Sequence, residues 1–283
     1  MRWQIFHVSP SGFIHSQALS EVAIALRRGL LLLGHQADIT YQYKAAYDQT
    51  IVLGANFAPA EIFSLTSESI IIYNLEQIAL GSPWLSPYYL RVLNKFSVWD
   101  YSKQNIQELT RMGIQEVQHC PIAYVKDLER IPKIEKDIDI LFYGSINERR
   151  KQILGALQNA GLGVMQIFGL YGQERDGYIA RAKIILNLHF YESKVFEIVR
   201  VSYLLANGCF VVTENSPQPE IESQLASGMI LCPYDKIVFS CLEYIRKDQE
   251  REAIAIQGHK LFSNWRQEDM LRPLIKKSVL GAM

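Results

Sequence analysis

The stretch HFYESKVFEIVRVSYLLANGCFVVTE, residues 189–214, determines the fold that we expect for this chain. An apolar strand ends at His189, a helix is expected over 194–207, and a second apolar strand follows Gly208. A strand, a helix and another strand in short succession predict a crossover between parallel strands. Charged residues gather at the front end of this helix, and apolar residues gather toward Gly208. We therefore expect the front end of the helix to face a charged small molecule.

The same alternation of short apolar runs and helical periods extends in both directions from this stretch. In the N-terminal half we expect strands at 3–8, 37–41, 50–55, 69–74, 96–102 and 116–120, with helices at 15–35 and 103–112. In the C-terminal half we expect strands at 138–144, 163–169, 183–190, 209–214 and 228–232, with helices near 147–160, 173–182, 194–207 and 217–226. The pattern predicts an α/β protein with two Rossmann-like α/β/α domains.

A charge-rich segment, VKDLERIPKIEKDID at 125–139, interrupts this alternation and is the best candidate for a domain boundary. We expect an N-terminal domain over 1–130 and a C-terminal domain over 138–265. The last segment, 266–283, is expected to pack back on the N-terminal domain. Because open parallel sheets bind ligands beyond the carboxyl ends of their strands, we expect a site in a cleft between the two domains.

Composition limits the classes of function. Lysine plus arginine equals aspartate plus glutamate at 29 each, so we expect no general attraction to nucleic acid. Four scattered cysteines without metal-like spacing suggest reduced thiols in a cytoplasmic protein. We expect no signal peptide, because the apolar stretch at the N-terminus is too short and too polar. No apolar run reaches the roughly 20 residues that span a bilayer, although contact with a membrane surface stays open.

The first loop, HVSPSGFIHSQAL, has only Gly12 where a dinucleotide-binding loop needs three glycines. It still allows a ligand to approach the next helix through Gly12. His15 is expected at the start of that helix, where the dipole would keep it a neutral acceptor. His15 could equally cap or pack against the helix.

Two further loops of the N-terminal half carry acidic or hydroxyl residues. Glu76 follows the strand 69–74 and could accept a hydroxyl proton, or it could be an ordinary acidic residue in the first turn of a helix. Asp100 and Ser102 lie at the end of the expected strand 96–102, and capping of the next helix explains them better than catalysis.

The segment ILFYGSINERRKQIL, 140–154, predicts an anion site. A glycine permits close approach of the backbone, free amides follow, and Arg149, Arg150 and Lys151 lie near the positive end of the expected helix. A solvated basic helix start is the alternative. At the front of the helix 194–207, Lys194 and Arg200 could neutralise a diphosphate while a carboxylate grips ribose hydroxyls, although Glu197 and Arg200 also form an i,i+3 pair.

With these motifs in their order, the sequence resembles the GT-B glycosyltransferases, near the family-1 and family-4 group that includes CgeB-type proteins. The matching stretches are SPSGFIHSQALSEVAIALRRGLLLLGHQADIT in the N-terminal half, and DILFYGSINERRKQILGAL and VFEIVRVSYLLANGCFVVTE in the C-terminal half. The resemblance implies a nucleotide-sugar donor on the C-terminal domain and an acceptor on the N-terminal one. UDP-sugars are the first expectation.

The resemblance also implies site residues. Donor contacts are expected at Gly12, Gly144, Ser145, Asn147, Arg149, Phe168, Gly169, His189, Lys194, Phe196, Glu197 and Arg200. Catalytic roles are expected for His15, Glu76 and Arg200, with His15 as the first candidate for a general base. The chain departs from the family at Tyr203, where a glutamate usually stands, so the ribose contact is expected at Glu197.

The absence of a DxD triplet is typical of metal-independent transfer, in which basic side chains stabilise the departing diphosphate. No cofactor is expected beyond the donor substrate. The acceptor could be a glycan, a peptide, a lipid or a small molecule, and the stereochemical outcome stays open. The alternatives are a nucleotide-sugar epimerase or a sugar phosphorylase on the same fold, or a degenerate nucleotide-binding scaffold.

Overall fold

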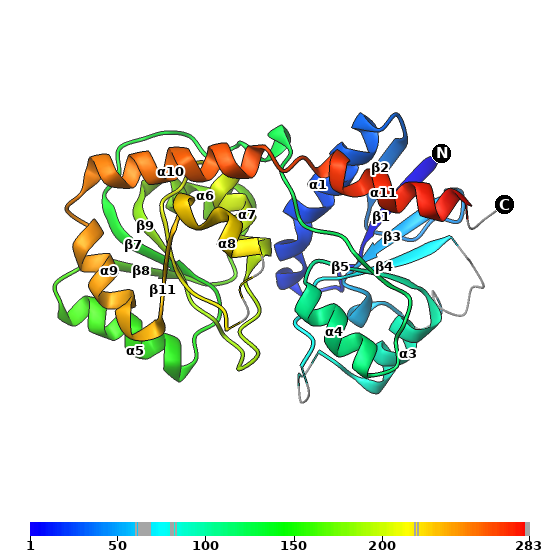
Figure 1. Cartoon of the computed structure of the whole chain (residues 1–283), viewed down its shortest axis with the longest axis horizontal. Coiled ribbons are helices and arrows are strands. Elements are labelled where there is room, and N and C mark those ends of the chain that lie inside the picture. The colour runs from blue at the N-terminus through cyan, green and yellow to red at the C-terminus, as the bar shows by residue number, and fades with distance from the viewer. Residues whose placement is uncertain are drawn as a thin grey trace. The chain divides into compact units, whose positions relative to one another are not determined.

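The computed structural model describes residues 1–59, 61, 69–79, 82, 84–217, 219 and 221–280, with the backbone alone for 276–280. The chain divides into two compact units (Figure 1). Unit 1 comprises Met1–Asp127 together with the chain from Trp265 onward, and unit 2 comprises Leu128–Asn264. The cleft expected between the two domains stays a prediction.

Unit 1 contains a parallel sheet of six strands in the order β2-β1-β3-β4-β5-β6. The strands are β1 Arg2–His7, β2 Gln36–Thr40, β3 Gln49–Leu53, β4 Ile70–Asn74, β5 Ser97–Asp100 and β6 Val117–His119. The helices are η1 Ile14–Leu19, α1 Ser20–Leu32, η2 Ala55–Phe57, α3 Pro87–Lys95, α4 Lys103–Arg111, η3 Lys126–Leu128 at the border, and α11 Gln267–Leu280.

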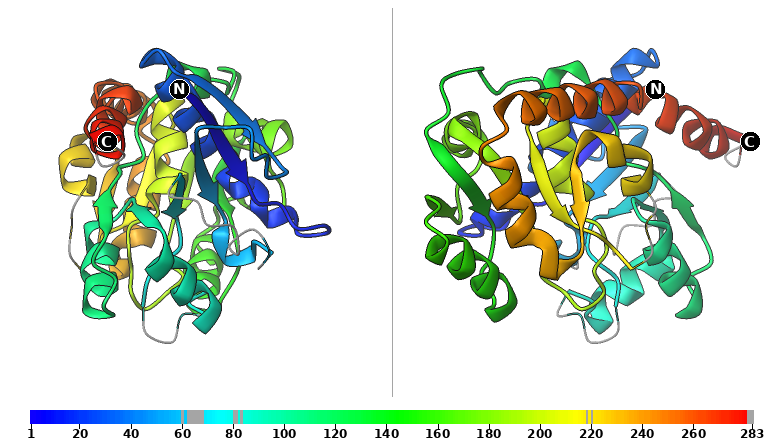
Figure 2. Two further views of the ribbon diagram at one scale, coloured as in Figure 1. Left: turned by 90° about the vertical axis from the view of Figure 1, so that its right-hand side faces the viewer. Right: turned by 60° about the vertical axis from the view of Figure 1, so that its left-hand side comes forward.

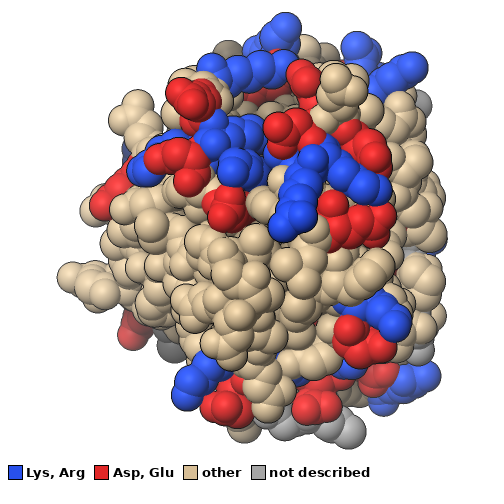
Figure 3. Space-filling view, turned by 90° about the vertical axis from the view of Figure 1, so that its left-hand side faces the viewer, with Lys and Arg blue, Asp and Glu red and all other residues tan. Residues whose placement is uncertain are grey.

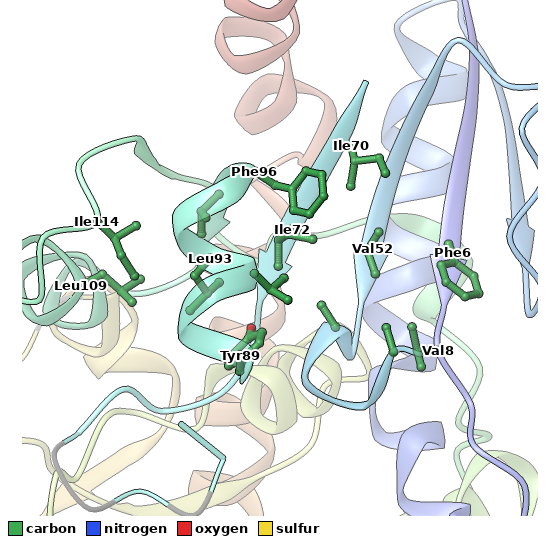
Figure 4. Packing of buried hydrophobic residues seen from close by; sticks show 14 of the residues in the cluster. Phe6, Val8, Val52, Ile70, Ile72, Tyr89, Leu93, Phe96, Leu109 and Ile114 are labelled. Carbon is green, nitrogen blue, oxygen red and sulfur yellow. The ribbon is translucent and has the colours of Figure 1, made fainter. Parts of the chain in front are cut away.

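The core of unit 1 follows the two-residue period of its strands. Phe6, Val52 and Ile72 point to one face of the sheet, where α3 and α4 pack on them (Figure 4). Ile5 and Ile51 alternate with these residues and are fully buried on the other face, which α1 covers. Burial on both faces explains why the strands are almost continuously apolar.

Helix α11 belongs to unit 1 and packs on α1. The contact is close because Gly29 has no side chain: a Cβ at Gly29 would lie 2.8 Å from Cδ1 of Leu271. The chain from Trp265 also pairs with the N-terminal part, since the amide of Tyr124 donates to the carbonyl oxygen of Trp265 at 2.7 Å. The last helix thus completes a layer of the first unit.

Unit 2 contains a parallel sheet of five strands in the order β11-β10-β9-β7-β8. The strands are β7 Ile138–Tyr143, β8 Val164–Ile167, β9 Ala182–Asn187, β10 Val211–Glu214 and β11 Ile230–Cys232. The helices are α5 Glu148–Asn159, α6 Gly172–Arg181, α7 Ile198–Ala206, α8 Ile221–Leu225, η4 Ala226–Gly228, η5 Tyr234–Lys236, α9 Ile237–Tyr244 and α10 Asp248–Ser263. Helices α5 and α9 pack on one face of the sheet, and α6 packs on β7 and β9 (Figure 2).

The predicted α/β class with two parallel sheets is confirmed, and three details of the prediction were wrong. Helix α3 was not predicted, although Ser86 caps it by accepting from the amide of Tyr89 at 3.1 Å. The expected helix 15–35 is divided into η1 and α1. The expected helix 194–207 begins only at Ile198, because Lys194 has a left-handed φ of 48° that no α-helix accommodates.

Candidate functional site

The strand order of unit 2 defines where its loops separate. Strand β7 lies between β8 and β9, so the loops that leave β7 and β9 turn in opposite directions from the middle of the sheet. In open α/β sheets, this point at the carboxyl edge is where ligands bind. The loops 144–147 and 188–197 and the end of β10 meet there, and they carry most of the predicted donor residues.

Glu214, the last residue of β10, is the centre of a buried ionic cluster. Its carboxylate accepts two hydrogen bonds from the guanidinium of Arg149, one of them from Nη1 to Oε2 at 2.6 Å. Lys194 Nζ lies 3.7 Å from Oε1, and the amide of His189 donates to Oε2 at 3.3 Å. Because only 2% of the Glu214 side chain is exposed, the two cations are held at this position by a desolvated carboxylate.

A second carboxylate, Glu197, lies beside this cluster just before α7. It accepts hydrogen bonds from His189 Nδ1 at 3.2 Å and from Asn187 Nδ2 at 3.1 Å. Burial by itself would raise the pKa of Glu197, but the bond from His189 and the charges of Arg200 and Arg150 lower it below its usual value. Glu197 is therefore a carboxylate and an acceptor at neutral pH.

Arg200 is held against the start of the loop after β7. Its Nη1 donates to Asn187 Oδ1 at 2.8 Å, and its guanidinium lies 4.9 Å from the ring centre of Tyr143. A Cβ on Gly144 would lie 2.8 Å from Nη2 of Arg200, and Gly144 has φ +133°. A glycine at position 144 thus provides both the space and the backbone conformation for this contact.

The three basic residues at the start of α5 have three different roles, which corrects the prediction that they act together on an anion. Only Arg149 joins the Glu214 cluster. Arg150 is 3% exposed and donates to the carbonyl oxygens of Ser145, at 2.9 Å, and of Leu188. Burial, followed by repulsion from Arg200, lowers the pKa of Arg150 to about 10. Lys151 points to solvent, since 72% of its side chain is exposed.

Asn147 caps α5 and is part of the scaffold of this loop. Its Oδ1 accepts from the amide of Arg150 at 2.9 Å, and its Nδ2 donates to the carbonyl oxygen of Phe190 at 3.0 Å. Ser145 is exposed in the same loop. The side chain of Asn147, predicted to contact the donor, therefore already joins the loops that follow β7 and β9.

Three other predicted donor residues differ in exposure. Phe168 is 57% exposed and precedes Gly169, which has φ +75°, in the loop after β8 next to Gly144. Phe196 is only 6% exposed and so supports the turn before α7 from inside. His189 is 1% exposed, and within the described part of the chain its Nε2 has no hydrogen-bond partner.

The predicted residues of unit 1 lie beyond β1. Gly12 is exposed in a turn with φ +77°. His15 lies in η1, and α1 begins five residues later at Ser20, so the argument that placed His15 at the N-terminus of that helix was wrong. His15 packs edge-on against Phe13, with ring centres 5.5 Å apart.

Glu76 follows β4 in a loop and not in the first turn of a helix, the alternative that the sequence had left open. Its Oε1 accepts from Asn56 Nδ2 at 3.3 Å, and its amide donates to Asn74 Oδ1 at 3.3 Å. Burial raises the pKa of Glu76 to about 7, although the bond from Asn56 opposes this shift. Such a carboxyl group can both take up and release a proton near neutral pH.

Asp100 and Ser102 have the structural role that was favoured for them. Ser102 caps α4 by accepting from the amide of Asn105 at 3.3 Å. Asp100 is fully buried and accepts from Asn74 Nδ2 at 2.6 Å and from the amide of Ser102 at 2.8 Å. Three aromatic residues near these loops are at most 3% exposed and belong to the core: Tyr89, Trp99 and Tyr101.

Sequence reasoning missed Glu214, Asn187 and Tyr234. Glu214 ends an apolar strand, and Asn187 is the one polar residue near the end of β9, so both carried the signal of a polar side chain at a strand exit. Tyr234 lies 85 positions from Arg149 in the chain and carried no such signal. Its ring lies 4.0 Å from the guanidinium of Arg149, and its hydroxyl donates to the Arg149 carbonyl oxygen at 2.6 Å.

Tyr203, which stands where the family usually has a glutamate, points away from this site. Its hydroxyl donates to Asp176 Oδ2 at 2.7 Å and accepts from Arg130 Nη2 at 3.1 Å. Its ring lies between the guanidinium groups of Arg130 and Arg175, at 5.1 and 4.6 Å. Tyr203 therefore stabilises the attachment of the segment after residue 127 to α6 and α7.

Over the described residues, no group of three or more histidine, cysteine, aspartate or glutamate side chains is arranged to hold a metal ion. The four cysteines are buried and form no disulfide. In the same part of the chain, no helix has both the length and the apolar character needed to cross a membrane.

No protein-family model matches the chain. Among curated proteins, it is similar to two uncharacterized proteins of Acanthamoeba polyphaga mimivirus. One is 29% identical over 187 residues, which are 62% of this chain and 59% of the relative. The other is 32% identical over 180 residues, which are 62% of each chain. The chain thus spans about six tenths of the length of these relatives.

Solved structures match the fold along nearly the whole chain. An α-glucosyltransferase in complex with UDP-glucose and DNA containing an abasic site has a TM-score of 0.69 at 10% identity, covering 99% of both chains. AviGT4, a glycosyltransferase involved in avilamycin A biosynthesis, has 0.62 at 13%, covering 98% of this chain and 97% of that one. HepE of Anabaena in complex with UDP and glucose has 0.60 at 11%, covering 100% and 99%. The two-domain α/β layout is that of the GT-B fold.

Proposed function

We propose that the chain is a glycosyltransferase that binds a nucleotide-diphosphate sugar, with UDP-sugars as the first choice, at the strand exits of unit 2. The observation that carries this proposal is the cluster in which Glu214 holds Arg149 and Lys194 beside Arg200. Glycosyltransferases among the structural neighbours, in complexes with UDP or UDP-glucose, support the choice of donor.

Charge balance favours a diphosphate as the ligand. Four cationic side chains meet two carboxylates at these exits: Arg149, Arg150, Lys194 and Arg200 against Glu197 and Glu214. The excess positive charge is partly desolvated, and an anion with two or more charges would compensate it. In the transfer reaction, the same cations would stabilise the negative charge that develops on the leaving diphosphate.

The sugar and base of the nucleotide would lie on either side of these cations. Glu197 stays ionised and is the best acceptor for ribose hydroxyls. Phe168, exposed beside Gly169, offers a ring next to which a base could stack. Gly144 would allow the phosphates to approach the backbone at the exit of β7.

On unit 1 we propose that the acceptor binds near Glu76, which acts as the general base if the reaction inverts the anomeric centre. Its pKa of about 7 suits a group that must accept a hydroxyl proton at neutral pH. His15, the first candidate from the sequence, becomes the second candidate for the base. If configuration is retained, no base is required, and the arginine and lysine residues of unit 2 dominate catalysis.

We further propose that transfer needs no metal ion, since basic side chains are in place to neutralise the diphosphate. The acceptor class is open among glycans, peptides, lipids and small molecules. The expectation that nucleic acid is not a partner rests on net charge alone, and the α-glucosyltransferase neighbour was in complex with DNA. An acceptor panel should therefore include DNA. We also propose that the chain belongs to the CgeB-type group and that the protein is cytoplasmic.

The test is UDP binding measured by calorimetry on the full chain. Arg149→Ala, Lys194→Ala and Arg200→Ala should each weaken binding by about 1–3 kcal/mol, the range for a charge-assisted hydrogen bond. Lys151→Ala is the matched control, because this residue is on the same helix as Arg149 but 72% exposed. Unchanged affinity in all three folded variants would remove the donor site.

Turnover then separates the alternatives on the same fold. With UDP-glucose and EDTA but no acceptor, slow hydrolysis supports a transferase, and epimerised sugar supports an epimerase. Release of a sugar phosphate when inorganic phosphate is supplied supports a phosphorylase. Nucleotide binding without turnover on any acceptor supports a degenerate scaffold.

A further inference from the structure

Unit 2 contains a large pocket at the edge of its sheet opposite the ionic cluster of Glu214, Arg149 and Lys194, the donor cluster. The pocket lies where the strands begin: Lys136 precedes β7, Lys183 lies at the start of β9, and Cys209 precedes β10. Residues 131–136 and helix α10 form its walls. Its volume of about 850 Å³ lies within the roughly 300–1,000 Å³ of small-molecule pockets. Because the pocket lies where the strands begin, it is separate from the strand exits, which are at the carboxyl edge.

Charged side chains surround this pocket. Figure 3 shows basic and acidic residues crowded around a depression in the upper part of one face of the molecule, above a broad area without charges. Most of the pocket's charges have partners. Lys183 Nζ lies 2.8 Å from Asp139, His259 lies 2.9 Å from Glu129, and Arg251 donates to the carbonyl oxygens of residues 244 and 245 and to a nearby carboxylate.

Two lysines of the pocket, Lys133 and Lys136, differ from these residues because they form no ion pair with any described residue. Across the described chain, no carboxylate oxygen lies within 4.0 Å of the ammonium nitrogen of Lys133 or Lys136. Lys136 lines the pocket and is an exposed residue. Partial desolvation of its ammonium group lowers its pKa. Cys209 and Glu252 raise the pKa, whereas Arg251 and Lys133 repel the ammonium group and lower it.

Lys133, Lys136 and Arg251 line the same pocket, and the positive charges of Lys133 and Arg251 oppose that of Lys136. Two ammonium groups without ion pairs match the charge of a phosphomonoester, which is close to −2 at neutral pH, better than that of a single carboxylate. A phosphate has three terminal oxygens to accept from both lysines. A bound anion would offset the repulsion between these cations.

Part of the pocket wall is apolar, although the carboxylates Asp248 and Glu252 also line it. Ile131, Ile179 and Phe210 line it, together with Ala255 and Ile256 of α10. Ile256 is 57% exposed, so one side of the pocket presents apolar surface to solvent. A ligand with an anionic head and an apolar body would contact both parts of the wall.

We propose that this pocket is a second ligand site, specific for a small phosphomonoester with an apolar body and independent of nucleotide binding. The phosphate contacts Lys133 and Lys136, and the body packs on the apolar residues of the segment 131–134 and α10. The site does not depend on the function proposed for the strand exits.

The experiment uses phenyl phosphate as the probe, titrated into the full chain by calorimetry with and without saturating UDP. We expect saturable binding at submillimolar concentration, unchanged by UDP, and at least tenfold weaker binding of benzoate and phenol. Displacement by UDP, equal affinity for benzoate or phenol, or no saturable binding would each overturn the proposal.

Variants locate the probe. Lys136→Met and Lys133→Met, which keep most of the apolar stem, should each weaken phenyl phosphate at least tenfold without altering UDP affinity. Lys260→Met is the matched control, since Lys260 is exposed on the same helix α10 and does not line the pocket. Thermal unfolding verifies that each variant folds. Unchanged probe affinity in both folded pocket variants would refute the assignment.

Discussion

The carboxyl edges of the two sheets use the same strand geometry for different chemistry. In both units the first strand lies between the second and the third, so the loops separate at the same relative position. At this edge in unit 2, arginine and lysine side chains surround Glu214 and Glu197. In unit 1, Asn74, Asp100 and Asn105 form an amide and carboxylate network beside Glu76.

The two networks respond differently to burial. In unit 2, nearby cations keep the pKa of the buried Glu197 below its usual value. In unit 1, burial dominates and the pKa of Glu76 rises to about 7. One edge is therefore suited to holding an anion and the other to moving a proton, although both belong to the same kind of sheet.

The largest effect is expected from removing the proton acceptor. Glu76→Gln should reduce transfer, or hydrolysis of UDP-glucose where no acceptor is known, by about 10²–10⁴-fold, the range for general acid–base catalysis. UDP affinity should not change, because the proposed role of Glu76 is to take a proton from the acceptor and not to hold the diphosphate. His15→Ala is the comparison variant. A large loss in His15→Ala with full activity in Glu76→Gln would transfer the role to His15.

The stability of the protein should depend on pH through Glu76. Its folded pKa of about 7 lies above the usual 4.5. The unfolded chain therefore loses this proton first, and the free energy of unfolding should fall as pH rises from about 4.5 to about 7. The decrease is at most about 3.5 kcal/mol, at about 1.4 kcal/mol for each pKa unit.

Activity that depends on ionised Glu76 should rise over the same interval, opposite to stability. Denaturant unfolding and rate measurements at several pH values test both trends. Glu76→Gln should remove them together. If the pH dependence of unfolding survives in this variant, another group causes it.

A smaller effect is expected where Gly144 contacts Arg200. Gly144→Ala would place a Cβ 2.8 Å from Arg200 Nη2 at φ +133°, so the arginine must move and the backbone is strained. We expect a stability loss of about 1–2 kcal/mol and weaker UDP binding. Gly155→Ala, in α5 with no atom within 4 Å of the new Cβ, is the control and should stabilise the protein by about 0.5–1 kcal/mol. Equal behaviour of the two variants would contradict this account.

The smallest effect separates backbone from charge at Lys194. Its φ of 48° suits glycine, so Lys194→Gly should be about 1 kcal/mol more stable than Lys194→Ala. Both variants lack the ammonium group near Glu214, and both should bind UDP more weakly by the same amount. Chemical denaturation and calorimetry measure the two quantities. Different UDP affinities would show that the backbone conformation itself matters for binding.

Much of the fold followed from local pattern. Almost continuous apolar runs such as IDILFY become strands buried on both faces, and helical periods between them become the crossovers, because burial of apolar surface requires little information from distant residues. The ends of helices were harder to predict where the backbone conformation of a single residue sets them. The helix that was expected from Lys194 begins at Ile198 because of a left-handed φ that composition does not reveal.

By itself, the sequence determined the α/β class, the alternation of strands and helices in two halves, and the fact that polar residues follow the strands of both. Tertiary structure alone decided which of these polar residues meet. Arg149 and its neighbour Arg150 point to different partners, and Glu214 reaches Arg149 across 65 positions. The reason is physical. Strand order determines which loops become neighbours, and a buried charge is stable only when it is paired with another group. The chemistry of the site therefore depends on contacts between residues that are distant in the chain.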